Sequence, residues 1–99
     1  MDINTLNLSG TIGYVETHTF ANRRLYELFL AVNRYSKGEE QTRWFPVKYL
    51  CSANSKLELR VGTNIVLNGH LEANVWQPKG CNFPVKDIFA AAAIIKVIK

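Results

Sequence analysis

Hydrophobic and polar residues alternate along most of this chain with a period of two, which places every second side chain on the same face of a β-strand. Clusters of turn-forming residues separate the alternating stretches. The pattern predicts the strands Thr5–Val15, Leu25–Asn33, Thr42–Leu50, Asn64–Trp76 and Asp87–Val97. We therefore expect an all-β domain built as a small five-stranded barrel.

The last of these stretches contains two opposing signals. Ala90–Ala93 is a run of the residue with the highest helix propensity, whereas Ile94–Ile98 is rich in β-branched residues. We interpret at least Asp87–Val97 as a strand, because four strands need a fifth to close a barrel. A C-terminal helix is the alternative.

The alternation also predicts which side chains fill the core. In the first two strands the inward residues are Leu6, Leu8, Gly10, Ile12, Tyr26, Leu28, Leu30 and Val32. In the third strand they are Phe45, Val47 and Tyr49, and in the fourth they are Ile65, Leu67, Gly69, Leu71, Ala73 and Val75. Trp44 and Trp76 have the opposite parity, so both indoles are predicted to face outward.

The segments between and within the strands carry further signals. Gly10 and Gly13 predict a bulge in the first strand, and Pro46 predicts an edge or bulged position in the third. The connections are predicted as a hairpin turn at 21–24, a mobile polar loop at Arg34–Gln41, a segment with a helical turn at Cys51–Leu59, and a loop at Gln77–Pro84. Within the third of these, Leu57 and Leu59 are expected to plug the barrel floor.

Length and charge limit the class of protein. The 99 residues are enough for one domain, residues 1–99, because two cores would each be too small. No apolar run reaches the ~18 residues of a membrane span, and the acidic N-terminus lacks the pattern of a secretory signal. The formal charge of +4 favours a polyanionic partner. We expect a cytoplasmic, nucleoid-associated protein.

The sequence contains no pattern for a catalytic, metal or cofactor site. Its eight acidic residues are scattered, and no His/acid pair is set for hydrolysis. Cys51 and Cys81 lie far apart and are interpreted as thiols, with a disulfide or a metal site as the minority interpretation. His18 and His70 have no ligand-like spacing. We expect no enzyme, no metal and no cofactor.

The two outward tryptophans lie among basic residues. An exposed indole is unfavourable unless it meets a partner, and flat aromatics beside cations are what unpaired bases require. The candidate nucleic-acid-binding residues are Trp44, Trp76, Tyr35, Lys48, Arg43, Arg34, Lys37 and Lys79. The alternative is that the tryptophans pack in a subunit interface, or that a bulge turns one of them inward. Phe29 on the outward face of the second strand fits an interface as well as a base platform.

Three segments resemble bacterial single-stranded-DNA-binding proteins: 4–13, 40–47 and 61–71. The order of parts is also similar, with a Gly-bearing first strand, Thr-x-Trp opening the third strand, Val-Gly-Thr before the fourth, and a Trp at its end. The resemblance implies an OB-fold barrel that binds single-stranded DNA (RNA is the other candidate) without sequence preference, in replication, recombination or repair. It implies a homo-oligomer, with a tetramer favoured over a dimer.

The resemblance also assigns positions. Trp44 and Trp76 occupy two of the family's base-stacking positions, Tyr35 lies near a third, and the fourth falls at Tyr49 or Leu50. The family usually has basic residues before the last tryptophan, where this chain has His70, Glu72 and Asn74. This difference predicts weaker electrostatic attraction for DNA.

The family usually ends in a flexible linker and an acidic tip, which are expected to be absent after Ile98-Lys99. That feature is similar to the primosomal replication protein N type, so the alternative function is an adaptor that bridges DNA and a helicase or another replication partner. Assembly is predicted from Thr5–Ser9, an alternating stretch expected to form an exposed edge that a symmetry mate covers. Phe29 and Val66 are the candidate apolar contacts for a tetramer.

Overall fold

Five strands form a closed barrel in the computed structural model, which describes residues 2–77, 79–80, 82 and 85–98. The strands are β1 (Leu6–Phe20), β2 (Arg23–Ser36), β3 (Glu39–Ser52), β4 (Asn64–Trp76) and β5 (Val85–Val97). Their order around the barrel is β1-β2-β3-β5-β4. The all-β prediction is confirmed, and β5 contains the alanine run as strand rather than helix.

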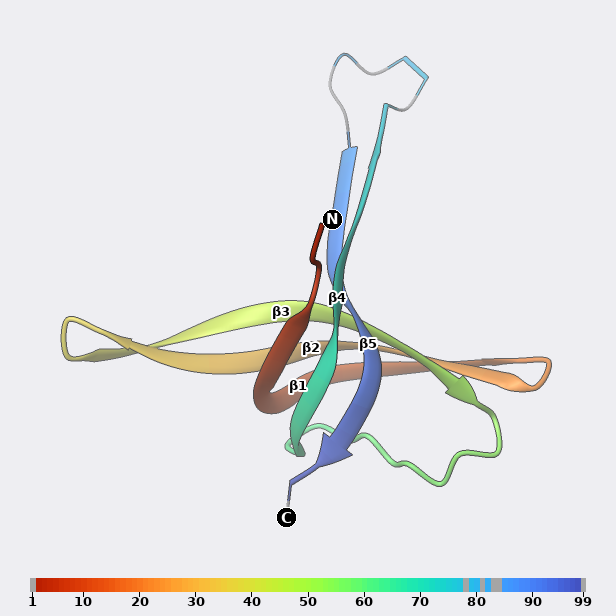
Figure 1. Cartoon of the computed structure of the whole chain (residues 1–99), viewed down its shortest axis with the longest axis horizontal. Helices are drawn as coiled ribbons and strands as arrows, with labels where there is room; N and C mark the ends of the chain where they lie inside the picture. The colour runs from red at the N-terminus through yellow and green to blue at the C-terminus, as the bar shows by residue number, and fades with distance from the viewer. Residues whose placement is uncertain (1, 78, 81, 83–84, 99) are drawn as a thin grey trace.

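Only part of each strand belongs to the barrel, because three hairpins extend beyond it as two-stranded arms (Figure 1). The β1–β2 and β2–β3 hairpins leave on opposite sides, and the β4–β5 hairpin rises away from both. The β1, β2 and β4 pairings are antiparallel, whereas β3 meets β5 in parallel over Val47–Tyr49 alone. Pro46 lies just before that short pairing, consistent with its missing backbone donor.

The core forms from the inward positions of the strands. Its most deeply buried side chains are Ile12, Leu30, Val47, Ile65 and Leu67. Leu59 is also buried and Leu57 packs against the core, so the prediction that they plug the barrel is confirmed. The Tyr26 hydroxyl donates to the Leu57 carbonyl oxygen at 2.9 Å and ties this segment to β2.

Two predicted connections are wrong. The supposed mobile loop Arg34–Gln41 is mostly strand, because β2 continues to Ser36 and β3 begins at Glu39. Lys37 and Gly38, with φ of 53° and 79°, form the intervening turn, and two positive φ angles match the twist of a tight hairpin. The segment Cys51–Leu59 contains no helix: β3 runs to Ser52, a single turn follows in which the Ser55 amide donates to the Ser52 carbonyl oxygen at 3.0 Å, and the rest of the segment is irregular.

Two predictions about β4 and its neighbour are also wrong. The inward residues of β4 were predicted to continue to Val75, but Leu71 and Val75 are 49% and 61% exposed. The reason is that β4 leaves the barrel after Gly69, where its pairing with β1 ends. Thr5–Ser9 was expected to be a free edge, but Leu6–Thr11 pairs with Asn64–Gly69 as the barrel closes. The edge argument for oligomerisation therefore does not hold.

The first strand bends at the predicted bulge. The β1–β2 register shifts between Ile12 and Tyr14, which places Gly13 in the irregularity. The bend allows the start of β1 to pair with β4 and its end to form an arm with β2. The prediction of a bulge from the glycines is confirmed.

Candidate nucleic-acid interface

Trp44 lies on the outer face of the barrel, where its indole rests against Gly13 of β1. A Cβ built at Gly13 would overlap the six-membered ring of Trp44, so only glycine leaves room for this arrangement. The side chain is nevertheless 57% exposed. An indole supported on one side and open on the other is suited to stack on a flat ring.

Tyr35 extends the same face toward the tip of the β2–β3 arm. Tyr35 pairs with Glu40 and Trp44 with Ala31, and these positions share one parity. Arg34 and Arg43 have the other parity and so lie on the opposite face of the arm; Arg43 donates to Gln41 Oε1 at 3.0 Å.

Two of the predicted lysines lie at the tips of different arms. Lys37 is in the exposed turn at the tip of the β2–β3 arm, and Lys79 is exposed beyond the end of β4. The predicted basic residues are thus separated: Arg34 and Arg43 lie on the face of the β2–β3 arm opposite to Trp44, and Lys37 and Lys79 lie at the tips of two arms.

Trp76 is the last residue of β4, in the β4–β5 arm, whereas Trp44 belongs to β3. It is 49% exposed and shares its face with Glu72, which is opposite Phe89, and with Asn74, which is opposite Asp87. The two tryptophans therefore bracket a surface that crosses β3, β5 and β4, and do not form a single cluster.

Lys48 occupies the middle of that surface. Its ammonium lies 3.6 Å from Asp87 Oδ2 and 4.2 Å from the centroid of the Phe89 ring. The outward parity predicted for Lys48 is consistent with these contacts.

A groove of about 320 Å³ lies beside Lys48 on the outer face. Its aromatic walls are Tyr14, Phe29 and Phe89, with the Tyr14 and Phe29 ring centroids 5.8 Å apart. Sequence reasoning did not assign Tyr14 and Phe89, and it left Phe29 between two roles. Outward parity on their strands could have identified them. For Tyr14 this parity is hidden by the bulge at Gly13, and for Phe89 it is hidden by the alanine run that follows, which shows no alternation.

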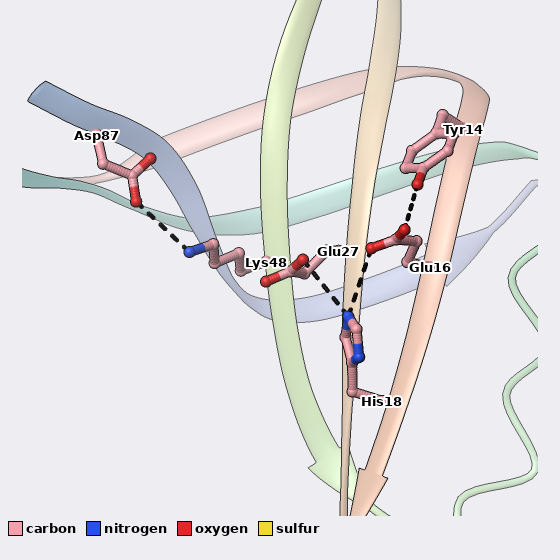
Figure 2. A network of polar contacts seen from close by, with 6 residues as sticks. All are labelled: Tyr14, Glu16, His18, Glu27, Lys48 and Asp87. Atoms are coloured by element: carbon pink, nitrogen blue, oxygen red, sulfur yellow. Dashed lines mark hydrogen bonds and ion pairs between the residues drawn. The ribbon is translucent and has the colours of Figure 1, made fainter.

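Three carboxylates, those of Glu16, Glu27 and Asp87, line this groove, and Figure 2 shows the polar contacts around them. His18 Nε2 lies 3.5 Å from Glu16 Oε2 and 3.6 Å from Glu27 Oε2, and the Tyr14 hydroxyl donates to Glu16 Oε1 at 2.5 Å. The hydrogen bond to Glu16 raises the pKa of Tyr14, and burial adds to the effect. A neutral Tyr14 is therefore maintained as the donor.

Glu16, His18 and Glu27 also present one ligand atom each within 4.8 Å of one another. These donor types suit a divalent transition metal, although exposed groups of this kind are common without an ion. Sequence spacing did not identify the group, because Glu27 meets the other two only through the β1–β2 pairing.

The path from the groove to Trp76 carries no described cation. Its β4 positions are His70, Glu72 and Asn74, with His70 Nε2 2.6 Å from Glu72 Oε1. These non-basic residues, which stand where the resembling family usually has basic ones, thus lie on the same outward surface as Trp76.

Comparison with solved structures identifies the architecture. A single-stranded-DNA-binding protein (SSB) from Plasmodium falciparum, in complex with single-stranded DNA, is similar with a TM-score of 0.79 and 15% identity, over 100% of this chain and 97% of that chain. The dimeric N-terminal domain of PriB from Thermoanaerobacter tencongensis is similar with a TM-score of 0.67 and 22% identity, over 97% of each chain. The barrel is an OB-fold.

The OB-fold predicted from the sequence is therefore confirmed, and it extends over essentially the whole chain. No protein-family model matches the chain, and no curated protein matches its sequence. Across the described part of the chain, no helix is long and apolar enough to cross a membrane.

Proposed function

We propose that this protein binds single-stranded DNA without strict sequence preference, as a non-enzymatic component of replication, recombination or repair. The observation that carries the proposal is the exposed Trp44 indole, held against Gly13 on the outer face of an OB-fold. Tyr35 continues this face, and Trp76 lies at the far side of the same surface. Base stacking on such rings contributes ~1–3 kcal/mol per base and tolerates any sequence.

The surface between the tryptophans supports a binding path. Lys48 lies at its centre, and Lys37 and Lys79 lie at the tips of the arms that bound it. The similar Plasmodium falciparum SSB was solved with single-stranded DNA, which supports the same ligand class here. RNA is the competing ligand, because stacking and phosphate contacts do not distinguish the two sugars.

Fluorescence anisotropy of a labelled oligo-dT tests the proposal. Trp44→Ala is expected to weaken binding by about 5- to 150-fold, which is the stacking range expressed as affinity. Val61→Ala is the matched control, because it shortens an exposed side chain in the segment between β3 and β4. Equal affinity of wild type and Trp44→Ala would contradict the proposal.

The second candidate function is a primosome-type adaptor that bridges DNA and a helicase or another replication partner. It is favoured by the carboxylates on the DNA-facing side and by the similarity to the PriB domain. Under this proposal, the exposed aromatics contact a protein. Unchanged DNA affinity in Trp44→Ala and Trp76→Ala, together with loss of a replication partner in pull-down, would favour the adaptor.

We also propose that the chain forms at least a dimer, with a tetramer as the larger assembly. The β4–β5 arm exposes Leu71, Val75 and Ile88 on the face opposite to Trp76, and an apolar ribbon of this kind gains by pairing with a second copy. This replaces the β1 edge as the physical basis. A monomer at micromolar concentration in light scattering would refute it.

A further inference from the structure

The groove beside Lys48 has the dimensions and walls of a pocket for one flat ring. Its volume of about 320 Å³ is at the lower end of small-ligand pockets. Three aromatic residues line it, Tyr14, Phe29 and Phe89, and the other apolar lining residues are Leu28, Pro46 and Val47. It lies two residues along β3 from Trp44, so a strand stacked on Trp44 can place a neighbouring base in it.

The charge at the rim is unusual for a surface that follows phosphates. Glu16, Glu27 and Asp87 all line the groove, and Lys48 is the only cation among the described residues that line it. A phosphate placed between these carboxylates would be repelled. A base edge that carries hydrogen-bond donors would be attracted, because an ionised carboxylate is an acceptor only.

The three carboxylates differ in how much acceptor capacity they have left. Tyr14 donates to Glu16, and Lys48 pairs with Asp87, as Figure 2 shows. The Glu27 carboxylate makes a single polar contact within the described residues, the 3.6 Å ion pair with His18. Its side chain is 37% exposed, which leaves oxygen lone pairs open to the groove.

We propose that this groove is a base-selective subsite in which Glu27 accepts a hydrogen bond from the exocyclic amine of a cytosine. The inference rests on the proposed function and adds a base preference to it. Cytosine presents its N4 amine as a donor. Uracil presents the O4 carbonyl oxygen at the same place, and a carboxylate repels it. The N3–H of uracil lies between two carbonyl oxygens, so it is a poor substitute.

Comparison of oligo-dC with oligo-dU isolates the contribution of the N4 amine, because the two bases have the same ring, lack a methyl group, and differ at N4 against O4 and at N3. Both oligonucleotides are labelled at the same end, equal in length, and longer than about 16 nucleotides, the upper end of OB-fold site sizes. The full chain is titrated at fixed salt and neutral pH. We expect oligo-dC to bind about three- to tenfold more tightly, the factor that one ordinary hydrogen bond contributes.

Glu27→Gln tests the assignment, because it retains the shape of the side chain and adds an amide donor that can meet O4. The variant is expected to abolish or reverse the preference for oligo-dC. Glu58→Gln is the matched control, because Glu58 lies between β3 and β4, outside the groove lining. It removes the same charge and is expected to leave the ratio of the two affinities unchanged. Phe89→Ala is expected to weaken both oligonucleotides, because it removes one wall of the groove.

The outcomes separate the subsite from the proposed function. Equal binding of oligo-dC and oligo-dU overturns the subsite while leaving DNA binding intact. A preference for oligo-dC that survives in Glu27→Gln overturns the role of Glu27. Failure of both oligonucleotides to bind wild-type protein refutes the proposed function itself.

Discussion

Gly13→Ala is expected to impair DNA binding without removing any aromatic residue. The added Cβ would occupy the place of the Trp44 six-membered ring, and the indole must move away from β1. The displaced atoms are at the far end of a side chain, so the fold can adjust at little cost. Trp44 would then lose the support that holds its ring in position for stacking.

The expected size follows from the stacking energy. A correctly held indole contributes ~1–3 kcal/mol per base, so losing its position is expected to weaken binding about fivefold or more, and by no more than Trp44→Ala does. The thermal midpoint is expected to stay close to that of wild type. Gly10→Ala provides the contrast, because its Cβ would overlap the backbone carbonyl of Ala31. It is expected to lower the thermal midpoint and spare DNA affinity.

The assay is a double-mutant cycle measured by anisotropy with oligo-dT. Because Gly13→Ala acts through Trp44, the double variant is expected to bind no more weakly than Trp44→Ala alone. Additive losses, or wild-type affinity in Gly13→Ala, would refute this reasoning.

Three further predictions follow from other contacts. Leu67→Ala, in a fully buried position, is expected to reduce the free energy of unfolding by about 2–5 kcal/mol in urea titrations, and a loss well below 1 kcal/mol would show that the core is misplaced. Lys48→Met is expected to lower the slope of log affinity against log salt by about 1, whereas Lys56→Met, in the segment between β3 and β4 and outside the proposed binding path, is expected to leave the slope unchanged. Burial raises the pKa of the Tyr49 hydroxyl above 10.0. The stability that the neutral hydroxyl contributes is therefore complete below pH 10 and is lost as the pH rises through the folded-state pKa. In denaturant titrations, Tyr49→Phe is expected to lose less stability than wild type between neutral and strongly alkaline pH.

The barrel was predictable because its signals are local. Alternation in β1 to β3 separates buried residues such as Leu28, Leu30 and Val47 from exposed Trp44, and every one of these placements is confirmed. The strand assignment of 87–97 followed from the need to close the barrel, and Leu59 was expected as an apolar plug of the barrel floor. Gly13 predicted the bulge, since glycine inside a strand pattern commonly marks one.

The groove and the arms were not predictable for a physical reason. Alternation reports parity, but it does not report where a strand leaves the barrel, so Leu71 and Val75 were assigned to a core that ends near Gly69. The groove combines residues from four strands, and the Glu16–His18–Glu27 contacts depend on the β1–β2 register after the bulge. Sequence order alone contains neither relation.

The central claim is that Trp44 and Trp76 bind single-stranded DNA by stacking, with help from cations. The chain has two tryptophans, so a fluorescence titration with oligo-dT in wild type, Trp44→Phe and Trp76→Phe reports each indole separately. We expect quenching in all three proteins at low salt, with an affinity that falls as salt rises. No quenching at low salt, or an affinity indifferent to salt, would contradict it.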